Sequence, residues 1–304
     1  MIKWMIFCLV CLSNGLFADA AVTYEFSGGR FGDNLLTYLH AKWLSYHYQI
    51  PLIYRPFSYS SELVLDDKEI RESLEDKSRH HIDLDHQHPI PLAASSSVFV
   101  CPYFPEIEWE LKRQSYFYFK VDWKNEGFRK IVREMISPKK NLQLVFPPQD
   151  VLSVAIHLRE GGGYDDEGHK LAHPLKTPPL TFYSDSLIKV LDLFPGQPIY
   201  CHIFTDALQP PVLIEKIQHM LPPNAPIVFN YRKENNRHDS NVLEDFFSLL
   251  NFDILIRAES NFSIVPSFIN DYAVVCFPAT YSIQGSLVKI EEIQTGAVNP
   301  DASV

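Results

Sequence analysis

Two nearly continuous apolar runs constrain the fold of this chain more than any other feature. Residues 151–158 and 199–205 are almost entirely apolar, as strands are when helices cover both faces of a parallel sheet. A polar loop and then a helical pattern follow each run, and the helical patterns cover residues 178–194 and 212–220. Strands that alternate with helices in this way predict an α/β fold with a parallel sheet.

The same alternation is present nearer the N-terminus. Residues 22–26 and 50–54 are predicted strands, and a glycine-containing turn separates the first of them from a predicted helix over residues 35–48. Asp33 or Asn34 is the predicted N-cap of this helix, because both side chains accept hydrogen bonds from backbone amides. The strand, turn, helix and strand make a second α/β unit.

Shorter elements complete the two units. The other predicted strands cover residues 98–102, 227–229, 253–256 and 273–277, and the other predicted helices cover 123–136, 243–250 and 262–270. Residues 138–149 are rich in proline and polar side chains, which is typical of a linker. We therefore predict two Rossmann-like domains that face a cleft, over residues 21–145 and 146–304.

Residues 1–20 have the pattern of a cleavable signal peptide. Lys3 precedes an apolar run over residues 4–12, and Ala18-Asp19-Ala20 supplies the small residues that signal peptidase requires. The run is too short to span a bilayer, and no later segment is long enough. We expect an exported chain without a transmembrane segment after leader removal: secreted or periplasmic, or luminal in a eukaryotic secretory pathway. A short apolar N-terminal strand is the alternative.

Charge and cysteine content exclude several classes of protein. The formal net charge of −10 and the absence of a long lysine or arginine run argue against a nucleic-acid partner. Cys101, Cys201 and Cys276 are widely spaced between apolar residues, which favours buried thiols and leaves one disulfide as the alternative. Histidines and aspartates gather in residues 79–88, but their spacing fits no metal site and favours a surface loop, so no metal site is predicted.

Four segments place glycines, charges and hydroxyl groups where predicted strands end or helices begin. Their candidate ligand-binding residues are Arg30, Phe31, Gly32, Asn34, His157, Arg159, Asp206, Asp245, Asp253, Ser260, Asn261, Phe262 and Ser263. Ligands of open α/β sheets bind outside the carboxyl ends of the strands, and helix N-termini favour anions. An arginine at such a strand end can hold phosphate oxygens with its planar guanidinium. A tight turn, a surface arginine and a helix cap are the purely structural alternatives.

Three of these segments resemble motifs of the GDP-fucose-dependent fucosyltransferase superfamily, which includes α1,2-, α1,6- and protein O-fucosyltransferases. Arg30-Phe31-Gly32-Asp33-Asn34 resembles the Arg-Phe-Gly-Asn-Gln segment of that superfamily. His157-Leu158-Arg159 resembles its first donor motif, His-x-Arg, and Phe204-Thr205-Asp206 resembles its second.

The fourth segment resembles the third motif of the same superfamily. That motif has an aspartate, a second aspartate eight residues later and a Ser-Ser/Thr-Phe-Ser cluster, and this chain has Asp245, Asp253 and Ser260-Asn261-Phe262-Ser263. The order and spacing of the four segments agree from residue 27 to about residue 270. The resemblance implies a GT-B-like fold with an acceptor-side N-terminal domain and a nucleotide-sugar donor domain at the C-terminus.

The resemblance also implies a reaction and roles for its residues. The reaction is an inverting, metal-independent transfer from GDP-fucose to a glycan or protein hydroxyl, with no further cofactor. Arg159 would hold the β-phosphate and assist GDP departure, His157 would contact the ribose or phosphate region, and Asp245 would accept hydrogen bonds from guanine. Ser260, Asn261 and Phe262 would line the phosphates, with Arg30, Gly32 and Asn34 on the other side. Asp206 and Asp253 would be supporting residues.

This chain also departs from the superfamily pattern. Asp33 and Asn34 stand where the superfamily has Asn and Gln, and Asn261 replaces a Ser or Thr. The glycine-rich loop after Arg159 is longer, and its acidic residues Glu160, Asp165 and Asp166 are candidates for the catalytic base, although solvated loop carboxylates are the simpler interpretation. Two alternatives therefore stand beside fucosyl transfer: a transferase of the same fold with another nucleotide sugar, and an inactive secreted effector that binds a glycan or nucleotide.

Overall fold

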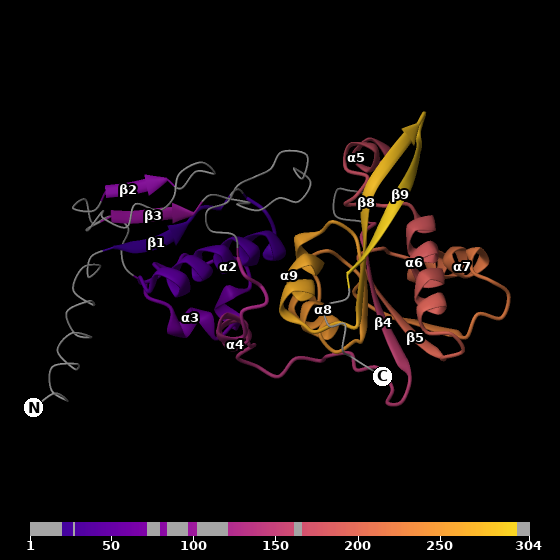
Figure 1. The fold of residues 1–304 in the computed structure, drawn as a ribbon, viewed down its shortest axis with the longest axis horizontal. Coiled ribbons are helices and arrows are strands. Elements are labelled where there is room, and N and C mark those ends of the chain that lie inside the picture. Colours follow the sequence, from indigo (N-terminus) through magenta and orange to yellow (C-terminus); the bar gives the residue numbers. More distant parts are fainter. Residues whose placement is uncertain are drawn as a thin grey trace, which may run out of the picture. The chain divides into compact units, whose positions relative to one another are not determined.

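The chain divides between Lys140 and Asn141 into two units, and each unit has a sheet of its own (Figure 1). The computed structural model describes residues 20–26, 28–71, 80–83, 97–101, 121–160 and 166–296. The predicted leader lies outside the described residues except for Ala20. The division falls within the proline-rich stretch 138–149.

The described part of the N-terminal unit has a parallel sheet with the strand order β1-β3-β2. Its elements are β1 (Ala21–Tyr24), α2 (Phe31–Tyr48), the 3-10 turn η2 (Ser60–Glu62), α3 (Leu65–Lys68), β2 (His80–Asp83), β3 (Ser97–Cys101) and α4 (Glu126–Met135). Figure 1 shows α2 running beneath the strands. Leu35, Leu39 and Leu44, which have the predicted helical spacing, are fully buried.

The start of α2 differs from the prediction. The helix begins at Phe31, and its N-cap is Arg30 rather than Asp33 or Asn34. Asp33 is the third residue of the helix, and its carboxylate accepts a hydrogen bond from the Arg30 N–H at 2.8 Å. A carboxylate in this position satisfies an amide at the helix start and opposes the positive end of the helix dipole. The acidic departure at Asp33 therefore stabilises the start of α2.

The predicted strand over residues 50–54 is wrong. The segment is extended, but it forms only isolated bridges, between Val22 and Leu52 and between Ile53 and Ile70. Its buried side chains, such as Ile53, explain the strand-like apolar pattern.

The C-terminal unit has a six-stranded sheet in the order β6-β5-β4-β7-β8-β9 among the described residues. Its strands are β4 (Leu152–Leu158), β5 (Ile199–Thr205), β6 (Ile227–Tyr231), β7 (Ile254–Arg257), β8 (Val274–Gln284) and β9 (Leu287–Gly296). Its helices are α5 (Glu167–Ala172), α6 (Leu180–Leu193), α7 (Pro210–Met220), α8 (Val242–Leu249) and α9 (Asn261–Ile269). Neighbouring strands are parallel except for β8 and β9. The predicted α/β class is therefore confirmed.

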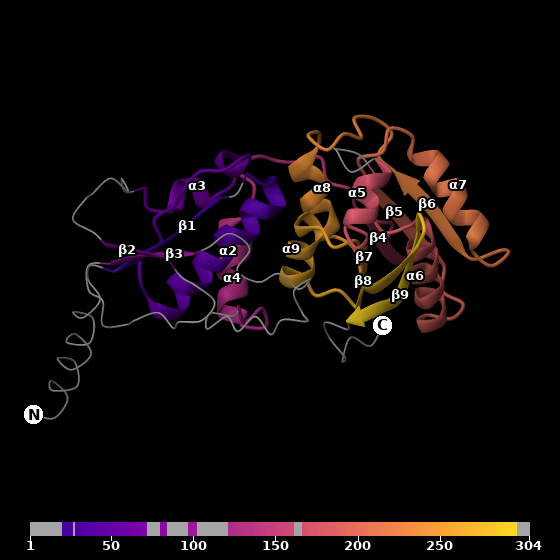
Figure 2. The same ribbon diagram turned by 90° about the horizontal axis from the view of Figure 1, so that it is seen from above.

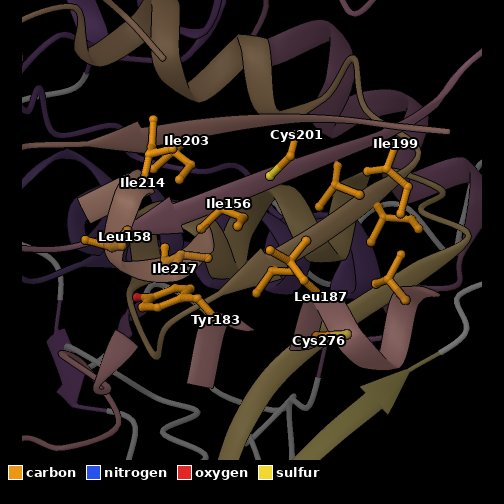
Figure 3. Packing of buried hydrophobic residues seen from close by; sticks show 14 of the residues in the cluster. Ile156, Leu158, Tyr183, Leu187, Ile199, Cys201, Ile203, Ile214, Ile217 and Cys276 are labelled. Carbon is orange, nitrogen blue, oxygen red and sulfur yellow. The ribbon is translucent and has the colours of Figure 1, made fainter. Parts of the chain in front are cut away.

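Helices cover both faces of this sheet, with α6 and α7 on one face and α8 and α9 on the other (Figure 2). Ile156 and Leu158 of β4 pack under α6 and α7 against residues such as Tyr183, Leu187 and Ile217 (Figure 3). The alternate side chains of β4 turn toward α8 and α9. Because neither face meets water, β4 and β5 are almost continuously apolar in the sequence.

The C-terminal hairpin was largely missed. The predicted strand over residues 273–277 is only the start of β8, which continues to Gln284 and pairs with β9. Figure 1 shows this hairpin projecting beyond the rest of the sheet. Beyond Phe277 the side chains are mostly half-buried or exposed, so the continuous apolar pattern of a buried strand stops there. The predicted loop over residues 159–177 also contains the short helix α5.

Two further features concern the predicted cysteines and membrane segments. Cys101, Cys201 and Cys276 are buried free thiols, as predicted. Burial raises the pKa of the Cys201 and Cys276 thiols, so both remain protonated at neutral pH.

Within the described residues, no helix combines the length and apolarity needed to cross a bilayer.

Candidate functional site

The carboxyl edge of the C-terminal sheet gathers most of the predicted ligand-binding residues. β4 and β5 are parallel and in register, with Leu158 beside Thr205 at their ends. β7 runs parallel on the other side of β4, with Arg257 beside His157. One predicted residue follows each of these strands: Arg159 directly after β4, Asp206 directly after β5, and Ser260 after a short loop from β7. The fold therefore places residues from three predicted segments at one edge, where α/β sheets bind ligands.

His157 links β4 to the start of α9. Its Nδ1 atom lies 2.8 Å from the hydroxyl oxygen of Ser263, and its ring packs on Phe262 with a centroid distance of 5.2 Å. The Ser263 hydroxyl also donates to the carbonyl of Ser260, at 3.2 Å. Burial, together with the positive charges of Arg159 and Arg257, lowers the pKa of His157 to about 3. The imidazole is therefore neutral at physiological pH and acts only as a hydrogen-bonding group.

The residues around Arg159 hold the start of its loop in place. Arg159 is half-buried and follows the last residue of β4. The carboxylate of Asp206 accepts a hydrogen bond from the backbone N–H of Glu160, at 2.8 Å. Asp206 thus orients the backbone next to Arg159. The carboxylate of Glu160 pairs with Lys170 at 2.8 Å, and Asp166 caps α5, so both of these candidate bases have structural contacts. The third candidate, Asp165, lies outside the described residues.

The N-terminus of α9 lies at the same edge. Ser260 is its N-cap, but the Ser260 side chain makes no capping hydrogen bond. Asn261 and Phe262 form the first turn and are half-buried, whereas Ser263 is fully buried against His157. The first amides of a helix point outward along its axis and carry partial positive charge. This turn therefore offers backbone donors to an anion.

Asp245 is held by an arginine that the sequence analysis did not identify. Arg232 donates from Nε (3.0 Å) and Nη2 (2.5 Å) to the same carboxylate oxygen, Oδ1 of Asp245. Burial raises the pKa of Asp245 to about 6 despite the opposing effect of Arg232. Asp245 lies in the first turn of α8. A ligand that binds this carboxylate must either displace Arg232 or share the carboxylate with it.

Asp253 does not belong to this group. It directly precedes β7, and Ser153 is the second residue of the neighbouring strand β4. The carboxylate of Asp253 accepts hydrogen bonds from the backbone N–H (2.9 Å) and the hydroxyl (2.6 Å) of Ser153. Because the strands are parallel, their starts lie at the opposite edge from His157 and Arg159. The supporting role predicted for Asp253 at the ligand site is therefore corrected to a structural one.

Replacing Asp253 with alanine is expected to lower the free energy of unfolding by about 1–3 kcal/mol, because two donors of Ser153 lose their acceptor. Affinity for a ligand at the carboxyl edge should not change. Urea unfolding and calorimetric titration of the variant measure the two quantities separately. A large loss of ligand affinity at wild-type stability would contradict the assignment.

The predicted residues of the N-terminal unit lie around the start of α2. Arg30 is exposed, whereas Phe31 is buried and packs near Phe57 and Tyr59 with centroid distances of 6.4 and 6.0 Å. Asn34 is buried, and its side-chain amide donates to the carbonyl of Gly29 at 3.0 Å. Phe31 and Asn34 thus stabilise the glycine turn from within. Gly32 is buried in the first turn of the helix.

Two buried polar residues on the α8 and α9 face were missed by the sequence analysis. Arg257 is the last residue of β7, and His202 is in β5 beside the rings of Phe204 and Phe252, with centroid distances of 4.6 and 6.2 Å. A polar side chain that interrupts or ends an otherwise apolar strand is the sequence signal that could have identified both.

No group of acidic, histidine or cysteine side chains in the described part of the chain is arranged to hold a metal ion. Only part of the histidine- and aspartate-rich stretch 79–88 is described, namely β2.

Comparison with solved structures identifies similar folds. A mutant of FUT1 from Arabidopsis thaliana in complex with GDP matches with a TM-score of 0.53 and 10% sequence identity, over 88% of this chain and 71% of that one. The NodZ α-1,6-fucosyltransferase soaked with GDP-fucose matches with a TM-score of 0.46 and 12% identity, over 92% and 99%. POFUT1 in complex with GDP-fucose matches with a TM-score of 0.44 and 11% identity, over 84% and 94%.

No protein-family model and no curated protein sequence matches this chain. Of the three solved structures, FUT1 alone exceeds a TM-score of 0.5, and at this low identity the similarity establishes the fold. The chain shares an α/β, GT-B-like fold with the FUT1 structure, as predicted.

Proposed function

We propose that this chain is a glycosyltransferase that moves fucose from GDP-fucose to a hydroxyl group of a glycan or a protein. The observation that carries the proposal is the hydrogen bond between His157 and Ser263, which lie 106 residues apart in the sequence. This bond joins the segments that resemble the first and third donor motifs. The fold shared with a protein solved in complex with GDP supports the same proposal.

In this proposal, the GDP diphosphate lies between Arg159 and the first turn of α9. Arg159 supplies a positive charge to the β-phosphate, and the amides at Asn261 and Phe262 supply aligned dipoles. The bond between C1 of fucose and the β-phosphate oxygen breaks, and negative charge grows on the departing GDP. Fixed donors that stabilise this charge lower the barrier most effectively, since they need no reorganisation. We propose that no metal ion or cofactor takes part, as the family resemblance implies.

The neutral His157 is suited to a sugar hydroxyl rather than to a phosphate. Its Nδ1 atom is engaged with Ser263, which leaves Nε2 as the second hydrogen-bonding atom of the ring. With a pKa of about 3 it carries no charge to attract a phosphate. We therefore place it against the ribose of the donor, with the guanine toward Asp245 and Arg232.

The proposed acceptor is a glycan or protein hydroxyl, and the attacking oxygen would reach C1 from the face opposite GDP. Residues 1–20 are the proposed signal peptide, which would place the enzyme in an exported or secretory-pathway compartment. For Arg30 and Gly32, at the start of α2, a role in donor binding is proposed from the family resemblance alone. Phe31 and Asn34 act indirectly by holding the turn that carries them.

A donor screen tests the proposal. The full chain is incubated with GDP-fucose, GDP-mannose or UDP-glucose in the presence of a chelator and a mixture of glycan and glycoprotein acceptors, and release of the nucleoside diphosphate is measured. GDP release should be fastest from GDP-fucose and should depend on the acceptors. Preference for another sugar would replace GDP-fucose as the donor, and GDP binding without turnover on any acceptor would favour an inactive binding protein.

A further inference from the structure

Arg257 is a buried cation at the carboxyl edge of the C-terminal sheet. It is the last residue of β7, is 2% exposed, and pairs in register with His157 on the neighbouring parallel strand. Residues paired in this way point to the same face of a sheet, so Arg257 and His157 share the face covered by α8 and α9. The positive charge of Arg257 is near enough to contribute to the low pKa of His157.

The hydrogen-bonding capacity of Arg257 is only partly used. Nη1 donates to a carboxylate oxygen of Glu259 (3.2 Å) and, more weakly, to the carbonyl of Ala258 (3.4 Å). The guanidinium carbon lies 4.6 Å from the ring centroid of Phe277, which fixes the plane of the group. Among the residues that the structure describes, no acceptor lies within hydrogen-bonding distance of the buried Nε atom.

This arrangement is costly for a residue with a purely structural role. A buried guanidinium loses its hydration, and a buried donor without a partner costs about 1–3 kcal/mol. The three preceding residues of β7, Ile254, Leu255 and Ile256, are fully buried aliphatic side chains, and a fourth would fill the position without these losses. A group with spare donors in register with His157 is instead suited to an anion that arrives with a ligand.

We propose that Arg257 is a second guanidinium that contacts the diphosphate of the bound nucleotide, on the β7 side of the site, and that Glu259 is its counter-ion when no ligand is bound. This inference rests on the proposed function, because it assumes a nucleoside diphosphate at the carboxyl edge. It adds a residue outside the segments that resemble the family motifs. A planar guanidinium can form paired hydrogen bonds to phosphate oxygens. These are stronger than its single contact with one carboxylate oxygen of Glu259.

The test compares GDP with guanosine, since only GDP carries the diphosphate. Arg257→Gln in the full chain is expected to weaken GDP binding about tenfold or more and to leave guanosine binding unchanged, because the charged hydrogen bonds are lost. Arg257→Lys, which keeps the charge and most of the stem, should retain part of the GDP affinity and serves as a second variant if Arg257→Gln does not fold. Calorimetric titration measures both ligands.

Glu259→Gln gives a prediction of opposite sign. Removing the competing carboxylate should strengthen GDP binding about threefold or more, and the gain should vanish in the double variant Arg257→Gln/Glu259→Gln. Equal losses of affinity for GDP and guanosine in Arg257→Gln, or no loss for either ligand, would overturn the role of Arg257. The proposed function would still stand as long as the wild-type chain binds GDP. Failure of the wild-type chain to bind GDP would overturn both.

Discussion

Replacing Arg159 with alanine is expected to weaken GDP binding by about 2 kcal/mol, a factor of about 30 in the dissociation constant. The arginine follows the last residue of β4, and the hydrogen bond from Glu160 to Asp206 holds its backbone in place. Its side chain is therefore presented by a rigid strand end rather than by a free loop. Loss of a charged donor to a phosphate accounts for the size of the effect.

The same substitution should lower the rate of sugar transfer about 100- to 1000-fold, because Arg159 would contact the β-phosphate most strongly as GDP departs. Arg133→Ala is the matched control, since Arg133 is an exposed arginine on α4 of the other unit. Calorimetric titration with GDP and a GDP-release assay measure the two effects. An Arg159→Ala variant that binds GDP and turns over like the control would contradict the assigned role.

The C-terminal unit loses folding stability as the pH falls from about 7 to about 5. Replacing His202 with phenylalanine is expected to make this loss smaller by about 2 kcal/mol. Burial, with a smaller effect of Arg232, lowers the pKa of His202 from 6.5 to about 4. Between these pH values the unfolded chain binds a proton and the folded chain does not, so folding stability falls as the pH falls. Phenylalanine cannot be protonated and fits beside Phe204 and Phe252.

Other groups contribute to the acid response, so the comparison between variant and wild type matters. His157 should add a loss of the same sign from pH 6.5 to about pH 3. Asp245 opposes both, because its pKa is raised to about 6 and its protonation favours the folded state as the pH falls below that value. The difference between wild type and His202→Phe isolates His202.

The tryptophans provide an internal reference for this experiment. All 4 are at positions below 140, so tryptophan fluorescence reports on the N-terminal unit, whereas circular dichroism reports on both. Urea unfolding at both pH values should show the effect of His202→Phe in circular dichroism and not in tryptophan fluorescence. His219→Asn, at an exposed position on α7, is the control. An identical pH dependence in His202→Phe and wild type would rule out a neutral, buried His202.

The central part of the C-terminal sheet could be predicted because burial on both faces leaves a strong pattern. β5 has its predicted bounds, and β4 differs by one residue at its start. The hairpin of β8 and β9 left no such pattern, because its side chains alternate between half-buried and exposed. The extended segment around Ile53 misled the prediction in the opposite direction, since it is buried without forming a ladder.

The candidate site was predictable where sequence order follows strand order, and less so where it depends on register. His157 and Arg159 could be placed at a strand end from the apolar run that precedes them. The contact of His157 with Ser263 required knowledge that β7 lies beside β4, which no local pattern contains. Asp253 was assigned to the site from motif spacing alone, and the direction of β7 places it at the far edge. The same strand direction places Arg257, at the end of β7, at the carboxyl edge with His157.

Hydrogen–deuterium exchange of the full chain, with and without saturating GDP and in the presence of a chelator, is the most direct test of a diphosphate site at the carboxyl edge of this sheet. We expect slower exchange in residues 157–160 after β4, in the first turn of α8 and in residues 258–264 around the start of α9, with the amino edge near Ser153 unchanged. Protection confined to other parts of a folded chain, or no change at millimolar GDP, would contradict a nucleotide-diphosphate site at the carboxyl edge of this sheet.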